Sequence, residues 1–142
     1  MTARMFEVRG VPAPQGSKRH VGNGRMVESS KAVGPWREAV RGEAQRNIPA
    51  PFPGAVQVTM IFRFPRPKSH YGTGKNRMVL RPAAPAFLDG RPDVDKLARA
   101  VLDGLTMGGA FKDDAQVVEL LARKMYGPPG VMIRITGLGE DT

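Results

Sequence analysis

The sequence predicts a single α+β domain in which two helices pack on a mixed four-stranded sheet. Residues 55–64 alternate apolar and polar side chains, which is the period of a half-buried strand. Residues 93–106 repeat apolar side chains at helical spacing. The predicted elements follow one another in the order β-α-β-α-β-β over 142 residues, the length of one domain. We expect that domain to cover residues 1–142 without an internal boundary.

The N-terminal half is predicted to hold one strand, one basic loop and one helix. The strand covers residues 5–11 and ends at two prolines. Residues from about 15 to 31 place glycines among basic side chains, so this segment is predicted to be a flexible loop without a regular element. A helix is predicted from Pro35 to about Asn47, because proline suits the first turn and apolar residues recur at every fourth position from Trp36.

The C-terminal half is predicted to hold three strands, a second loop and a second helix. The strand at 55–64 leads into a proline-containing basic loop at about 65–91, and loops of this length inside a compact domain are usually functional or disordered. The helix over 93–106 is closed by two glycines. Strands at 117–126 and 131–136 follow, and the Gly-Pro-Pro-Gly sequence between them predicts a hairpin-like connection.

The charge of the chain favours a polyanionic partner, and nucleic acid is the commonest large one. The formal net charge is +9, with +11 in residues 1–88 and −2 in residues 89–142. A soluble protein of high pI without such a partner is the alternative. Nucleic-acid binding is predicted for basic side chains of the two loops and of the second helix: Lys18, Arg19, Arg25, Lys31, Lys68, Lys75, Arg77 and Lys96.

Composition excludes or disfavours several classes of protein. The absence of cysteine excludes disulfides, zinc–thiolate sites and cysteine nucleophiles. No apolar stretch approaches the roughly 20 residues of a membrane span, and residues 1–10 lack the apolar core of a secretory signal. A cytoplasmic protein without a membrane partner is therefore expected. No phosphate-cradling GxxxxGK[ST] motif occurs, so no nucleotide cofactor is expected.

Aspartates gather in the acidic part of the sequence. Six of them lie between residues 89 and 114, including the pairs Asp93–Asp95 and Asp113–Asp114, with Asp103 between the pairs. Carboxylates that lie close together repel one another unless a cation sits between them. Mg²⁺ prefers carboxylates, waters and substrate phosphates as ligands, and it can activate a bound water for attack on phosphorus.

The same aspartates also have purely structural interpretations. The first pair suits the N-cap and the first turn of the predicted helix, where a carboxylate complements the helix dipole. Arg99 lies four residues from Asp95 and four from Asp103, which would allow a salt-bridge stripe on the helix surface. The second pair could consist of turn residues that lead into the next strand. The residues alone leave both interpretations open.

Two segments together resemble the RusA family of Holliday-junction resolvases, which is found in phages and prophages. They are RPDVDKLARAVLDGL, from Arg91 to Leu105, and FKDDAQVVEL, from Phe111 to Leu120. The family is marked by a PDxDNL…K…D helix followed by a DDxQV turn into a strand. The opening strand that ends in proline and the basic loop after it are also similar to the family.

The resemblance implies a site, a cofactor and partners. Carried over residue by residue, the family's metal-binding aspartates fall on Asp93, Asp95 and Asp114, and its catalytic lysine falls on Arg99. The implied activity is Mg²⁺-dependent hydrolysis of paired phosphodiesters in four-way DNA junctions during recombination and repair, with Mn²⁺ as a substitute ion. A homodimer is also implied, because two-fold symmetric partners would supply the two cuts that one small domain cannot make.

Two residues depart from the family pattern. Lys96 replaces the asparagine after the second aspartate, which puts a cation beside the proposed metal. Arg99 keeps the charge of the lysine that it replaces but cannot act as a proton donor. Lys96 favours the main alternative, a protein that binds branched nucleic acid without cleaving it, because its ammonium could occupy the place of the metal. A nuclease of broader specificity for flaps or branched DNA is the other alternative.

Overall fold

The structure, a computed structural model, describes residues 2–16, 18–20, 26–28 and 31–139. It confirms the predicted α+β class and the order of the main elements in one small domain. In chain order the elements are β1 (Ala3–Arg9), β2 (Lys18–His20), β3 (Met26–Glu28), α1 (Val33–Asn47), β4 (Val56–Phe64), the 3₁₀ turns η1 (Lys68–His70) and η2 (Gly74–Asn76), α2 (Val94–Met107), the 3₁₀ turn η3 (Asp114–Gln116), β5 (Val117–Tyr126) and β6 (Gly130–Gly137).

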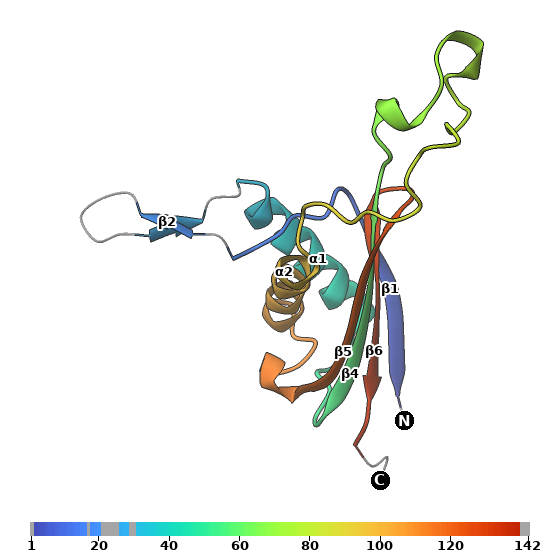
Figure 1. The fold of residues 1–142 in the computed structure, drawn as a ribbon. Helices are drawn as coiled ribbons and strands as arrows, with labels where there is room; N and C mark the ends of the chain where they lie inside the picture. Colours follow the sequence, from blue (N-terminus) through green and yellow to red (C-terminus); the bar gives the residue numbers. More distant parts are fainter. Residues whose placement is uncertain (1, 17, 21–25, 29–30, 140–142) are drawn as a thin grey trace.

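The mixed four-stranded sheet has the strand order β1-β6-β4-β5 (Figure 1). β4 pairs with β6 in antiparallel and with β5 in parallel orientation. The predicted hairpin-like connection between the last two strands is therefore wrong, because β4 lies between β5 and β6. The connecting residues pass the end of β4, where the Gly127 N–H donates to the Phe64 carbonyl at 2.9 Å. The apolar side chains of β4 are all buried, which a central strand with partners on both edges achieves.

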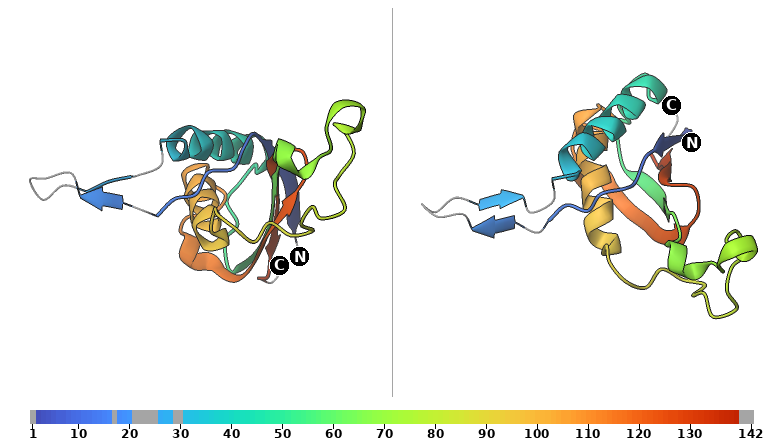
Figure 2. Two further views of the ribbon diagram at one scale, coloured as in Figure 1. Left: turned by 45° about the horizontal axis from the view of Figure 1, so that its top comes forward. Right: turned by 90° about the horizontal axis from the view of Figure 1, so that it is seen from above.

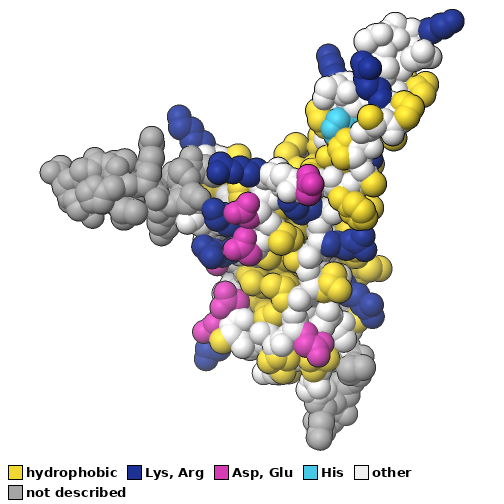
Figure 3. Space-filling model, in the orientation of Figure 1, with side chains coloured by type: hydrophobic (Ala, Val, Ile, Leu, Met, Phe, Trp, Pro, Cys, Tyr) yellow, Lys and Arg dark blue, Asp and Glu magenta, His cyan; other side chains and the backbone are white. Residues whose placement is uncertain are grey.

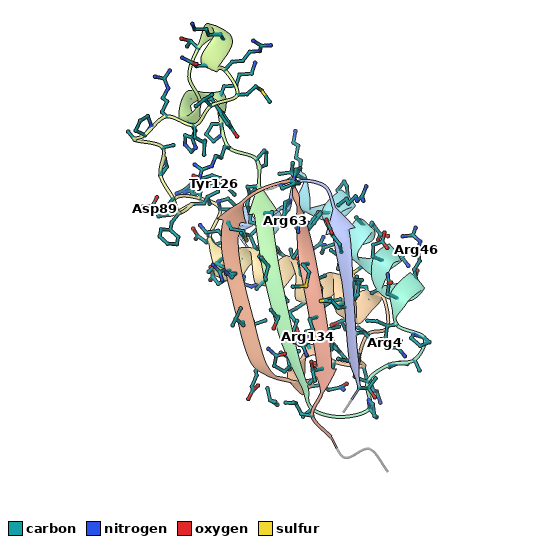
Figure 4. All side chains as sticks on the ribbon, turned by 90° about the vertical axis from the view of Figure 1, so that its right-hand side faces the viewer. Arg4, Arg46, Arg63, Asp89, Tyr126 and Arg134 are labelled. Carbon is teal, nitrogen blue, oxygen red and sulfur yellow. The ribbon has the colours of Figure 1, made fainter. Side chains whose placement is uncertain are left out.

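Both helices cover the same face of the sheet, and the core lies between them and the sheet (Figure 2). The two helices approach so closely that a Cβ placed on Gly104 would lie 2.8 Å from the Cβ of Val40. The opposite face of the sheet has no covering layer in the described part of the chain (Figure 4). No helix within the described ranges is long and apolar enough to cross a bilayer. The helix residues buried in the core include Trp36, Val40, Ala44, Leu97, Val101 and Leu105.

Two basic segments project from the body on different sides (Figure 1). The first contains β2 and β3, which pair in antiparallel orientation as a short ribbon. The expectation of a loop without regular structure at 15–31 thus differs from the structure. The sequence between the two strands contains Asn23-Gly24, a strong hairpin signal that outweighs the glycine content.

The second projection, residues 65–91, is called the arm below. It contains η1 and η2 and stands on the end of the sheet where β4 and β5 finish (Figures 1 and 4). The side chain of Tyr126 holds its base: the Arg66 guanidinium lies 4.2 Å above the centre of the tyrosine ring, and the His70 ring packs edge-on at 5.4 Å. The arm is therefore fixed to β5 at its root.

Candidate functional site

Asp93 and Asp95, the N-terminal acidic pair below, lie at the start of α2. Asp93 is the N-cap residue of the helix, but its side chain makes no capping hydrogen bond. Its carboxylate instead faces Lys96, whose Nζ lies 3.5 Å from Asp93 Oδ2. The capping interpretation therefore does not account for the side chain of Asp93, although the backbone of this residue starts the helix.

The root of the β2–β3 projection contacts the first turns of α2. The Gln15 backbone N–H donates to the Lys96 carbonyl at 3.0 Å. Gly16, which has a φ of 133°, lies so close to the helix that an added Cβ would approach the Nη1 of Arg99 to 2.6 Å. The basic projection is thus connected to the same two turns of α2 that carry the N-terminal acidic pair.

The root of the arm is fastened on the other side of the same helix end by Lys124 of β5. The Lys124 Nζ donates to the carbonyl of Gly90 at 2.6 Å and to the carbonyl of Pro92 at 2.9 Å. These two carbonyls precede Asp93 directly in the chain. Lys124 consequently fixes the backbone from which the carboxylate of Asp93 projects.

Further along α2, Asp103 belongs to a side-chain network with the N-terminal segment. Gln15 Nε2 donates to Asp103 Oδ2 at 2.5 Å, and the Nη1 of Arg37 donates to Gln15 Oε1 at 2.8 Å. Among the described residues, neither Asp95 nor Asp103 forms an ion pair with Arg99. The salt-bridge stripe considered from the sequence is therefore not formed.

The two adjacent aspartates after α2 have different roles. Asp113 caps η3: its side chain accepts from the Ala115 N–H at 2.8 Å, and Gln116 completes a capping box by accepting from the Asp113 N–H at 3.3 Å. Gln116 also donates to the carbonyls of Phe52 and Gly54, both at 2.8 Å, which ties η3 to the segment before β4. The turn-residue interpretation is confirmed for Asp113.

Asp114 lies with Asp103 and Asp113 around a cavity of about 340 Å³ at the C-terminal end of α2. These three residues are called the C-terminal acidic group below. Partial burial raises the pKa of Asp114 above its ordinary value, and the neighbouring carboxyl groups of Asp113 and Asp103 raise it further. A positive charge at this cavity would relieve that repulsion.

One chain does not gather the three predicted metal ligands into a ready cluster. Within the described residues, no three Asp, Glu, His or Cys side chains are grouped so that they could hold a metal ion. Asp95 and Asp103 are eight residues apart on α2, which corresponds to about 12 Å along the helix. Figure 3 shows acidic side chains over this part of the molecule, with lysine and arginine side chains beside them.

The comparison with protein families decides which family the chain belongs to. A family described as Endodeoxyribonuclease RusA matches residues 7–136, which is nearly the whole chain. The chain belongs to the RusA family. No match to the chain was found among curated proteins. The protein is thus a member of a family of endodeoxyribonucleases that act as Holliday-junction resolvases, as the two sequence motifs indicated.

As a RusA family member, the chain has a donor set that suits the expected cation. The side chains of Asp93, Asp95 and Asp114 are exposed and offer only oxygen ligands, the type that Mg²⁺ prefers. They also leave room for the waters and the substrate phosphate that Mg²⁺ keeps as ligands. The chemistry of the residues therefore fits the ion, although their assignment as ligands remains a prediction.

The predicted DNA-binding residues of this RusA family protein lie on both projections. Lys68 and Lys75 belong to η1 and η2, Arg77 follows η2, and Lys96 is in the first turns of α2. Lys31, directly before α1, is exposed. Lys18 and Arg19 are in β2, and Arg25 lies outside the described residues. Their binding to nucleic acid stays a prediction.

Sequence reasoning missed Gln15, Gln116 and Lys124 as residues that position the site. The signal for Gln116 was present, because the DDxQV motif contains it at the N3 position of a capping box. Gln15 and Lys124 contact residues that are more than thirty positions away in the chain. No local pattern could have predicted such contacts.

Proposed function

We propose that this protein is a Mg²⁺-dependent, structure-selective endonuclease that resolves Holliday junctions in DNA recombination and repair in the cytoplasm. One observation carries the proposal beyond family membership. The start of α2, with its acidic pair, lies between the roots of two basic projections that contact it through Gln15 on one side and Lys124 on the other (Figures 1 and 2). DNA backbone held by both projections would pass over those carboxylates.

The proposed metal ligands are Asp93, Asp95 and Asp114, with Mg²⁺ as the ion and Mn²⁺ as its substitute. A bound ion of this kind would supply a water of lowered pKa and would neutralise charge on the scissile phosphate. The side chains of the protein would hold the ion and orient the phosphate against it. Ligation by Asp114 agrees with its raised pKa, since a cation would favour the ionised carboxylate.

Arg99 is proposed to bind the scissile phosphate and to stabilise its charge in the transition state. An arginine stays protonated, so it can donate hydrogen bonds to phosphate oxygens but cannot give up a proton to the leaving group. Arg99 lies against Gly16, at the root of the β2–β3 projection. The leaving oxygen would therefore take its proton from water.

We propose that the active species is a homodimer. Resolution of a junction needs two cuts, and a two-fold symmetric pair of chains supplies two sites. Because one chain holds the N-terminal acidic pair and Asp114 at different ends of α2, a complete site needs either a movement of η3 or a contribution from the second chain. The structure is compatible with both arrangements.

The basic projections are proposed to contact the DNA backbone without reading its sequence. Binding through many lysine and arginine side chains releases counterions, so the affinity should fall steeply as the salt concentration rises. In the arm, the proposed contacts are Lys68, Lys75 and Arg77. Beside the metal site, Lys96 is the proposed contact.

The experiment that tests the function is a cleavage assay on synthetic four-way junctions, with and without Mg²⁺, beside a linear duplex. We expect paired, symmetric nicks that require the ion. Asp95→Asn should abolish cutting while junction binding persists, because the substitution removes a ligand charge and leaves the basic projections intact. Cutting that survives Asp95→Asn would refute the site, and equal cutting of flaps and junctions would indicate the broader nuclease.

A second candidate function, binding of branched nucleic acid without cleavage, is favoured by the contact between Lys96 and Asp93. The pair is partly exposed, with 35% and 53% of the two side chains accessible, and exposed pairs of this kind contribute only about 0–1 kcal/mol. A divalent ion can therefore displace the lysine. Thermal unfolding during a Mg²⁺ titration separates the candidates, because the ion should stabilise the nuclease and leave the binder unchanged.

A further inference from the structure

The arm carries a cavity that the proposed nuclease chemistry does not use. Its volume is about 820 Å³, within the range of roughly 300–1,000 Å³ that is usual for sites of small organic ligands. The walls include three cationic side chains and two with large apolar surfaces: Lys68, Arg77, Arg81, Tyr71 and Met78. We propose that this cavity binds one unstacked nucleotide of branched DNA, with the base against the apolar wall and its phosphates against the cations.

The cavity is held in shape by hydrogen bonds within the arm. The backbone N–H of Gly72 donates to the carbonyl of Val79 at 2.9 Å, and that of Arg81 donates to the carbonyl of His70 at 2.8 Å. The Arg81 Nε also donates to the carbonyl of Tyr71 at 2.7 Å, which fixes the guanidinium at the wall of the cavity. The turn is so tight that a Cβ on Gly72 would lie 2.7 Å from the Asn76 carbonyl oxygen.

The charge of the arm identifies the occupant as an anion. Residues 65–88 contain five lysine and arginine residues and no aspartate or glutamate. Such a segment concentrates phosphate groups at its surface. A neutral or cationic partner would gain nothing from this arrangement.

The apolar wall indicates that the anion also has a planar apolar part. Met78 is 82% exposed, and Tyr71 lines the same cavity. Aromatic side chains beside cations are the combination that single-stranded nucleic acid uses, because the base stacks on the ring while the backbone contacts the charges. A base inside a duplex is covered on both faces by its neighbours, so only an unpaired or branch-point nucleotide can enter.

This inference rests on the proposed action on branched DNA, since such DNA offers unstacked nucleotides beside a duplex. It adds a substrate feature: the arm would distinguish a branch point from a continuous duplex. The backbone contacts proposed for Lys75 and the other basic residues would act equally on both.

The test compares the affinity of the full-length protein for a four-way junction, for a duplex with one unpaired nucleotide and for the matched continuous duplex. Ca²⁺ replaces Mg²⁺ so that binding is measured apart from cleavage. We expect Tyr71→Leu to lower the preference for the unpaired nucleotide about 5-fold or more, while Tyr71→Phe keeps it, because stacking needs the ring and not the hydroxyl.

A matched pair of charge variants separates the cavity from the rest of the arm. Arg77→Gln removes a cation that lines the cavity, whereas Lys75→Gln removes a cation two residues away that does not line it. The first should reduce binding of the unpaired nucleotide more than binding of the duplex. The second should weaken both equally. Equal losses from both variants on both substrates would overturn the proposal.

A photocrosslink locates the nucleotide directly and does not depend on any variant that fails to fold. A 5-iodouracil at the unpaired position should crosslink to a peptide that contains Tyr71 or Met78. Crosslinking only to other peptides, or a shift of the arm variants from dimer to monomer with unchanged DNA preference, would overturn the proposal in favour of a protein contact. Cleavage with Mg²⁺ is scored separately, so loss of the preference with cutting retained rejects the cavity alone.

Discussion

The two ends of α2 carry acidic side chains in contrasting surroundings. At the N-terminal acidic pair, Asp93 faces a lysine and stands between two basic projections. In the C-terminal acidic group, Asp114 faces other carboxyl groups and its pKa is raised. The first end is prepared for a phosphate and the second lacks a positive charge. The contrast indicates that the metal site needs both ends, because one has the partners of the substrate and the other has the demand for a cation.

The largest expected effect comes from the adjacent residues of the C-terminal acidic group. Asp114→Asn should lower junction cleavage at least about 100-fold, because loss of a metal ligand removes several kcal/mol of transition-state stabilisation. Asp113→Asn should stay within a few-fold of the wild type, since asparagine also serves as an N-cap. Single-turnover cleavage rates at saturating Mg²⁺ measure both. Equal losses in the two variants would show that the cap, and not the ligand, was the sensitive feature.

Mixing two inactive chains sharpens the same comparison. If each site combines the N-terminal acidic pair of one chain with Asp114 of its partner, a mixed dimer of Asp95→Asn and Asp114→Asn chains regains one intact site. That mixture should nick one strand of the junction. If each site is built within one chain, both sites of the mixed dimer are damaged and the mixture stays inactive.

The next effect concerns Lys124, which fixes the backbone before Asp93. Lys124→Met keeps the length of the side chain but leaves the carbonyls of Gly90 and Pro92 without their donor, so we expect a loss of about 1–3 kcal/mol in the free energy of unfolding. We expect kcat to fall roughly 10-fold or more, because small displacements of reacting groups are costly. Lys124→Arg should restore part of kcat. Urea unfolding and cleavage kinetics measure the two, and unchanged kcat in a destabilised variant would limit Lys124 to a structural role.

These residues show how far the sequence reaches. The period of 55–64 and the stripe of 93–106 predicted β4 and α2 to within one residue at most ends, because burial on one face imposes a local repeat. The position of β5 was not predictable from pairing of neighbours, since the parallel contact with β4 depends on the whole crossover through α2. The motif pointed to Asp93, Asp95 and Asp114. Their separation along α2 depends on tertiary packing that no local pattern carries.

A smaller effect is expected at the N-terminal acidic pair. Lys96→Asn removes the ammonium that lies 3.5 Å from the carboxylate of Asp93. Because exposed pairs contribute about 0–1 kcal/mol, the Mg²⁺ concentration for half-maximal cleavage should fall by a factor of about 2–5. A Mg²⁺ titration of the cleavage rate measures it. A higher Mg²⁺ requirement in the variant would show that Lys96 supports the site instead of competing with the ion.

The smallest effect is on stability, and it depends on pH in a direction that follows from the raised pKa of Asp114. Burial, and then the carboxyl groups of Asp113 and Asp103, hold this pKa above its ordinary value of 3.8. The folded chain therefore binds the proton more tightly than the unfolded chain does. Ionisation then lowers the stability of the fold as the pH rises from 3.8 through the raised pKa.

Asp114→Asn removes that ionisation, so without divalent ions its Tm should exceed that of the wild type above this pH window. Below pH 3.8 both side chains are neutral and the two Tm values should converge. The difference should be small because Asp114 is exposed and solvent screens its neighbours. Thermal unfolding in EDTA across this range measures it. Saturating Mg²⁺ should reverse the order, since only the wild type gains a ligand-bound ion; a variant that stays more stable in Mg²⁺ would place the ion elsewhere.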